Sequence, residues 1–128
     1  KEKKLEKYVL FTGFLKTRNE LRDLFKAANL GLFPIGKQGG VLAPFEVICA
    51  GTPVVISEDM ETASMFKHFD FGIVTKNYVN AIYEIYKNQE KYNEQAKRAK
   101  KFTKENLTWK VFSEGMAEAF KDAWRKYK

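Results

Sequence analysis

The residues best suited to chemistry lie in one stretch, residues 36–55, which reads Gly-Lys-Gln-Gly-Gly-Val-Leu-Ala-Pro-Phe-Glu-Val-Ile-Cys-Ala-Gly-Thr-Pro-Val-Val. The pattern predicts a strand, a turn at Gly39 and Gly40, and then a helix that ends at Gly51. Two glycines let the backbone approach a ligand with its N–H groups turned outward, and the helix start adds the positive end of the helix dipole. A phosphate group fits such a turn; a Gly-Gly turn with a purely structural role is the alternative.

Glu46 is the candidate binding residue on this helix. It falls within the first turns, near the face of Gly39 and Gly40, where a carboxylate can accept hydrogen bonds from both hydroxyls of a ribose. Its apolar neighbours Phe45 and Val47 argue against an ordinary surface position. The alternative is an acid that only complements the helix dipole.

Short apolar runs at residues 8–12, 30–35, 53–57 and 71–75 indicate the elements that must position this stretch. They are bounded by Gly, Pro, Asn or Asp and separated by segments of helical length, so they predict strands alternating with helices. Their near-continuous apolarity suits strands that are covered on both faces. We therefore expect an α/β fold with a parallel sheet and flanking helices.

Helices are expected over residues 17–29, from Gly39-Gly40 to Gly51, over residues 61–68, and from Tyr78 to the end with a break near Asn88, which makes the last third all-helical. The first helix should open with a capping box formed by Thr17 and Glu20. One of its faces is predicted to pack on the sheet, and consists of Leu21, Leu24, Phe25 and Ala28. The last helix should start at the cap formed by residues 106–108. Its apolar stripe is predicted to be core: Trp109, Phe112, Met116, Phe120, Ala123 and Tyr127.

Composition restricts the classes of function. The chain has 128 residues, 45% of them apolar, which predicts one globular domain. With one cysteine, Cys49, and one histidine, His68, it can form neither an internal disulfide nor a cysteine zinc site, so no metal or cofactor is expected. Cys49 is interpreted as a small buried hydrophobe.

No apolar run is long enough to span a bilayer, and the first residues lack the apolar core of a signal peptide. Both features favour a cytoplasmic protein.

The formal net charge of +7 favours anionic partners but is too small to indicate nucleic acid, so no nucleic-acid partner is expected. The basic excess is uneven, because residues 76–128 hold 13 Lys or Arg against 7 acids. It is concentrated at Lys97, Arg98, Lys100, Lys101 and Lys104. This run is either a solvated helix face or a surface for an anionic partner, including peripheral contact with a membrane.

The stretch from Gln38 to Val55 resembles the nucleotide-binding signature of the large retaining glycosyltransferase family 4, which has the GT-B fold. That signature places two Glu eight positions apart, in the pattern Glu-Gly-Gly-Pro-x-x-Pro-Leu-Glu-Ala-x-Ala-Cys-Gly-x-Pro-Val-Val. Residues 9–14, Val-Leu-Phe-Thr-Gly-Phe, are similar to the family's Val-x-Phe-x-Gly strand. Residues 107–109, Leu-Thr-Trp, resemble the Phe-Ser-Trp that opens its closing helix.

The resemblance implies a role for each matching residue. Glu46 takes the place of the Glu that holds the ribose of a nucleotide-sugar donor. Gly39, Gly40, Val41 and Leu42 fall where backbone N–H groups meet the donor sugar and its diphosphate. Gln38 occupies the first Glu position, which contacts the transferred sugar. Since Gln carries no charge, this departure puts either the choice of donor or catalysis in question.

The resemblance implies a Rossmann-like domain, the C-terminal, donor-binding part of a GT-B fold. The family's Arg and Lys that clamp the diphosphate precede the region matched here. We therefore expect residues 1–128 to be one donor-binding domain that lacks its first strand-helix units, with the acceptor domain absent and the missing segment supplied in cis or trans.

The function implied is hexosyl transfer from a UDP-, GDP- or ADP-sugar, with retention, to an unknown acceptor that is a glycan, a lipid or a small molecule. We expect the full-length protein to be an enzyme of carbohydrate biosynthesis and this chain alone to be inactive. The alternatives are a nonenzymatic module that binds a nucleotide or phosphate, and a basic domain that binds an anionic surface.

Overall fold

The computed structural model describes residues 4–37 and 42–127. It is an α/β structure built on a parallel sheet of three short strands, β1 (Gly31–Phe33), β2 (Val54–Ile56) and β3 (Ile73–Val74), in the order β1-β2-β3. Leu32 pairs with Val55, which in turn pairs with Ile73. The three strands correspond to the last three of the four predicted from apolar runs.

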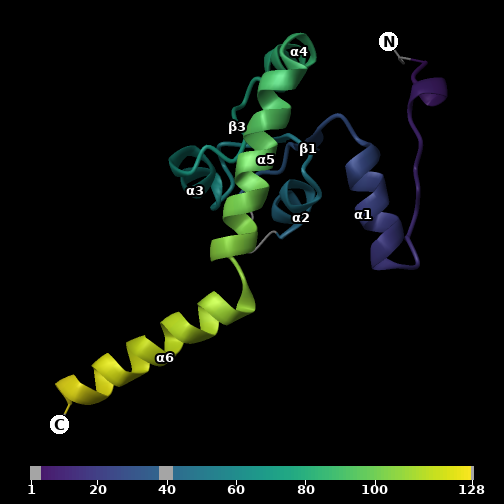
Figure 1. Ribbon diagram of the computed structural model, residues 1–128. Helices are drawn as coiled ribbons and strands as arrows, with labels where there is room; N and C mark the ends of the chain where they lie inside the picture. The colour runs from purple at the N-terminus through teal and green to yellow at the C-terminus, as the bar shows by residue number, and fades with distance from the viewer. Residues whose placement is uncertain (1–3, 38–41, 128) are drawn as a thin grey trace.

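In the described part of the chain, six α-helices surround and extend this sheet (Figure 1). They are α1 (Arg18–Ala27), α2 (Ala43–Ala50), α3 (Ala63–His68), α4 (Tyr78–Lys87), α5 (Gln89–Asn106) and α6 (Trp109–Lys126). The region from Tyr78 onward is helical as predicted, with the break at Asn88. Long α5 crosses the domain and packs mainly on α2, whereas α6 extends away from the other elements (Figure 1).

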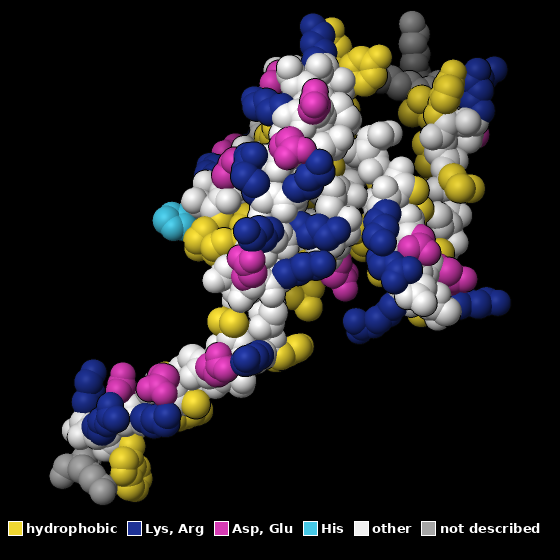
Figure 2. All heavy atoms as spheres, viewed as in Figure 1, with side chains coloured by type: hydrophobic (Ala, Val, Ile, Leu, Met, Phe, Trp, Pro, Cys, Tyr) yellow, Lys and Arg dark blue, Asp and Glu magenta, His cyan; other side chains and the backbone are white. Residues whose placement is uncertain are grey.

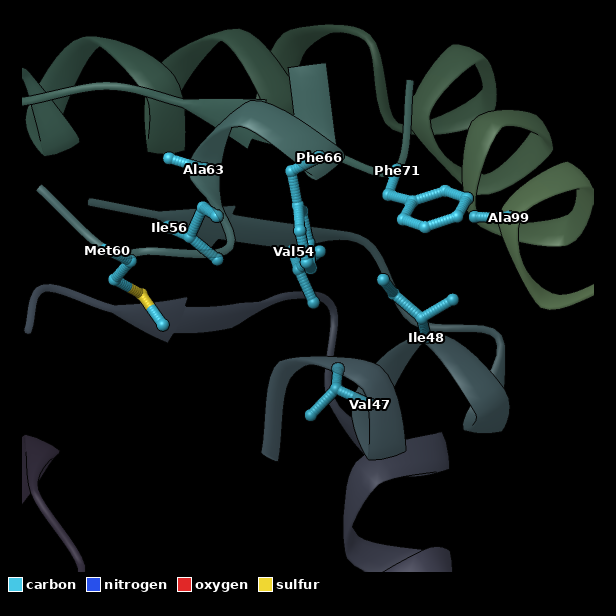
Figure 3. Close-up of a cluster of buried hydrophobic side chains, with 9 residues drawn as sticks. All are labelled: Val47, Ile48, Val54, Ile56, Met60, Ala63, Phe66, Phe71 and Ala99. Atoms are coloured by element: carbon cyan, nitrogen blue, oxygen red, sulfur yellow. The ribbon is translucent and has the colours of Figure 1, made fainter. Parts of the chain in front are cut away.

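The central strand β2 is buried on both faces. Val54 and Ile56 face the larger core cluster, in which Phe66 of α3 and Phe71 are also almost completely buried (Figure 3). Val55 points the other way, into a second cluster with residues of α4 and α5. Apolar coverage of both faces explains why the sequence of β2 shows no alternation of polar and apolar residues.

The predicted strand at residues 8–12 is wrong. The structure has a short 3-10 helix at Glu6–Tyr8 and then irregular chain, with Leu10 84% and Phe11 92% exposed. Its apolar residues match strand composition, but a strand also needs a neighbouring backbone, and within the described residues this segment pairs with none.

The capping box of α1 is confirmed: the backbone N–H of Glu20 donates to Thr17 Oγ1 at 3.2 Å, and that of Thr17 donates to Glu20 Oε2 at 3.0 Å. The predicted packing of this helix on the sheet is wrong, because α1 packs on α2 instead. Leu21 and Phe25 are consequently half-buried, while Leu24 and Ala28 are exposed.

The predicted burial of the α6 stripe is also wrong. Thr108 caps α6 as expected, with its hydroxyl accepting from the N–H of Val111 at 3.2 Å. However, no described residue of α6 is buried; Trp109 is 85% and Phe120 67% exposed. The spacing of the stripe is a true helical signal, but none of the described residues covers it enough to bury a side chain.

Candidate functional site

The centre of the candidate site is the first turn of α2. The carbonyl oxygen of Leu42 accepts hydrogen bonds from the N–H groups of Phe45 (2.9 Å) and Glu46 (3.1 Å), and Pro44 occupies the first turn, where it costs no intrahelical bond. At the other end Gly51 stops the helix with φ +93°, a conformation that glycine adopts readily. The predicted helix and its end are therefore confirmed.

Glu46 lies on the exposed face of α2. Val47 and Ile48 point into the core, at 2% and 0% exposed, so the apolar neighbours in the sequence do not enclose the carboxylate. No hydrogen bond or ion pair joins the Glu46 side chain to another residue of the described chain. The carboxylate is thus available to a ligand from solvent.

A groove of about 920 Å³ runs along this exposed face of α2, between α1 and α5. Leu42 and Glu46, one helical turn apart, both line it. Of the six residues that the sequence analysis singled out, these two are therefore brought together. The other four, Gln38, Gly39, Gly40 and Val41, lie outside the described residues.

Cationic side chains from two helices also line the groove. Two of them belong to the basic run predicted from the sequence as a solvated face or an anionic-partner surface, and those of α1 were not predicted. Arg18, Arg22 and Lys26 come from α1, and Lys100 and Lys104 come from α5. A signal was present, because each set repeats at four-residue intervals and so lies along one helix face. That the two sets meet across α2 depends on packing between distant segments.

Lys100 also contacts the C-terminal end of α2. Its ammonium group donates a hydrogen bond of 3.3 Å to the carbonyl oxygen of Ala50, in the last turn of the helix. A cation at that position complements the negative end of the helix dipole. Lys100 therefore fixes α5 against α2 as well as lining the groove.

Cys49 lies on the same face of α2 as Glu46 and is exposed, so its interpretation as a buried hydrophobe is wrong. The helix turn places it three residues after Glu46, on the groove side. Atoms packed around the sulfur still raise the pKa of the Cys49 thiol, mainly by desolvation, while Lys104 and Lys100 act in the opposite direction. The thiol thus reports on the charge within the groove.

The part of the chain that the structure describes contains no cluster of three or more His, Cys, Asp or Glu side chains arranged to hold a metal ion. None of its helices combines the length and apolar character needed to cross a membrane.

Residues 1–102 match the sequence model of the family described as Glycosyl transferases group 1. The match covers the whole α/β region together with most of α5, and it includes the helix that carries Glu46. No curated protein and no solved structure matches the chain.

Proposed function

Since the chain belongs to the group 1 glycosyltransferases, we propose that it forms the donor-binding part of an enzyme that transfers a hexose from a UDP-, GDP- or ADP-sugar. The family supports glycosyl transfer, with a sugar donor and an acceptor as partners. The proposal goes further than the family in three respects: the donor is a nucleotide sugar, the transferred sugar is a hexose, and the anomeric configuration is retained.

The observation that carries the proposal is the position of Glu46. Its carboxylate is exposed on α2, has no partner within the described chain, and lies close to the positive end of the helix. A ribose bound there would donate its two hydroxyls to the carboxylate oxygens, which are strong acceptors because they are charged. The diphosphate attached to that ribose would then extend toward the N-terminus of α2.

The residues before α2 would bind the rest of the donor. Backbone N–H groups of Gly39, Gly40, Val41 and Leu42 would donate to the diphosphate and sugar, where the helix dipole favours negative charge. The same dipole would stabilise the charge that grows on the departing diphosphate as its bond to the sugar breaks. Gln38 would hold a hydroxyl of the transferred sugar.

Replacement of Glu46 by Gln tests this assignment. We expect binding of the preferred nucleoside diphosphate to weaken by about 1.5–3 kcal/mol, the range for loss of a hydrogen bond to a charged group, with no change in the circular dichroism spectrum. Titrations with UDP, GDP and ADP identify the base. Glu61→Gln removes an exposed acid outside the groove and is the matched control. Unchanged affinity in Glu46→Gln would refute the proposal.

A nonenzymatic nucleotide-binding module is the second candidate, and Gln38 is the residue that favours it. A neutral amide stabilises a positively charged transition state less than a carboxylate does. If the protein is an enzyme and Gln38 holds the sugar, Gln38→Ala should lower turnover more than it lowers nucleotide affinity. Nucleotide binding without any transfer or hydrolysis of the matching nucleotide sugar would instead identify the module.

A further inference from the structure

The groove along α2 carries an excess of positive charge. Among the residues that the structure describes, five cationic side chains line it, three from α1 and two from α5, and Glu46 is the one acid. Figure 2 shows Lys and Arg side chains gathered over α1 and over the middle of α5, on either side of α2. Charges of one sign on two facing walls concentrate the electrostatic potential in the space between them.

This charge is not neutralised within the described part of the molecule. Arg18, Lys26 and Lys104 contact no acidic side chain there within ion-pair distance. Arg22 contacts only Asp23, its neighbour in the sequence, at 3.0 Å on the open surface. An anion that entered the groove would therefore meet three cations, Arg18, Lys26 and Lys104, that have no acidic partner to leave within the described chain.

The floor of the groove is apolar. It is formed by side chains from all three helices and from α3, including Phe25, Phe45, Met65 and Leu107. Neutral hydrogen-bonding groups are few: the hydroxyl of Thr103, one of them, already donates to the carbonyl oxygen of Ala99 at 2.8 Å. A floor of this kind can pack against a hydrocarbon chain, which needs no polar partner.

We propose that this groove binds a lipid phosphate, with the phosphate between the cations of α1 and α5 and the hydrocarbon chain on the apolar floor. The volume of about 920 Å³ lies within the range of about 300–1,000 Å³ usual for small-molecule sites. This binding goes beyond donor recognition and does not depend on it, although Glu46 borders both sites.

Cys49 provides a direct probe, because it is the single cysteine of the chain and lines the groove. The experiment measures the rate at which neutral iodoacetamide alkylates Cys49, with and without dihexanoyl phosphatidate kept below its micelle concentration. We expect the lipid phosphate to slow alkylation at least fivefold. The ratio of rates is taken at one pH for each variant, because cations of the groove also affect the thiol pKa.

Two charge reversals on α5 distinguish binding in the groove from nonspecific electrostatic attraction of the lipid phosphate to a basic protein. Lys104→Glu removes a groove cation, whereas Lys101→Glu makes the same change in net charge at an exposed residue that does not line the groove. Protection should disappear in Lys104→Glu and persist in Lys101→Glu. The neutral variants Arg22→Gln and Lys26→Gln should each weaken protection, with circular dichroism spectra unchanged from that of the wild type.

Other ligands provide the outcomes that would overturn the proposal. Equal protection by inorganic phosphate would show an anion site with no need for the hydrocarbon chain. Protection by a nucleoside diphosphate but not by the lipid phosphate would assign the groove to the donor. The proposal would also be refuted if the lipid phosphate gave no protection. The same holds if Lys101→Glu lost as much protection as Lys104→Glu.

Glu46→Gln distinguishes this proposal from the proposed function. Removal of the single negative charge from the groove should tighten lipid phosphate binding. The same substitution should weaken binding of a nucleoside diphosphate. If Glu46→Gln tightened lipid phosphate binding but left nucleoside diphosphate binding unchanged, the donor assignment would be refuted and the lipid phosphate site would stand.

Discussion

The hydroxyl of Thr52 donates a hydrogen bond of 2.6 Å to the backbone carbonyl oxygen of Phe25, 27 residues earlier in the chain. Thr52 is 3% exposed and lies in the turn between α2 and β2, whereas Phe25 is in the last turns of α1. The bond therefore ties α1 to the α/β core. Because α1 forms one wall of the groove, the position of that wall depends on this contact.

Thr52→Val should remove the hydrogen bond and keep the shape of the side chain. We expect the free energy of unfolding to fall by about 0.5–1.5 kcal/mol, since the carbonyl oxygen of Phe25 still accepts from the N–H of Ala28 at 3.3 Å. Urea denaturation measures the change. Thr52→Ser retains the hydroxyl that makes this bond and is the control for its loss. An unchanged free energy of unfolding in Thr52→Val would contradict a stabilising role for the bond.

Gly72 is predicted to tolerate no side chain. A Cβ atom built there would lie 2.5 Å from the backbone oxygen of Val54 and 2.6 Å from Val54 Cγ2, so β2 and β3 would have to separate. We expect Gly72→Ala to lower the free energy of unfolding by about 1–3 kcal/mol, the usual cost of overpacking a core.

Gly115 of α6 is the matched control, because nothing lies within 4 Å of a Cβ atom at that position. Gly115→Ala should increase helix content, since Ala is favoured over Gly in a helix by about 0.8–1 kcal/mol. Circular dichroism and urea denaturation measure both variants. Equal stability of Gly72→Ala and the wild type would contradict the close approach of β2 and β3.

Several local features could be predicted from the sequence. The capping box of Thr17 and Glu20, the glycine stop at Gly51 and the Thr108 cap all form. Each depends on hydrogen bonds between residues a few positions apart, so the residue types and their spacing contain the necessary information.

Features that depend on distant partners could not be predicted in the same way. The periodicity of α1 identifies an apolar face but not whether α2 or the sheet covers it, and the stripe around Phe120 gives no indication that it is exposed. The groove is the clearest case, because Arg22 and Lys104 are 82 positions apart in the sequence and approach only through their shared packing on α2.

The alkylation of Cys49 should depend on pH in a defined direction. Desolvation raises the pKa of the thiol in the folded state, so the neutral form is favoured there more than in the unfolded chain. The midpoint of the alkylation rate against pH should therefore be higher for the native protein than in urea. By the same linkage, any stability that the neutral thiol contributes is lost as the pH rises through the alkaline range.

Lys104→Gln extends this test. Lys104 lowers the pKa of the thiol, so its removal should move the midpoint to still higher pH. Lys101→Gln removes an equal charge outside the groove and should have a smaller effect. A midpoint lower in the native protein than in urea would show that the cations outweigh desolvation at Cys49.

Deletion of residues 109–128 should leave the α/β core almost as stable as before. Stabilisation by apolar residues follows the area that they remove from water, and no described residue of α6 is buried. We expect the free energy of unfolding measured in urea to change by less than about 1 kcal/mol, whereas Phe66→Ala, at a residue 0% exposed, should cost about 3–5 kcal/mol. The deletion should also reduce self-association, because it removes exposed aromatic side chains such as Trp109 and Phe120. A loss of stability close to that of Phe66→Ala would show instead that α6 packs against the core in solution.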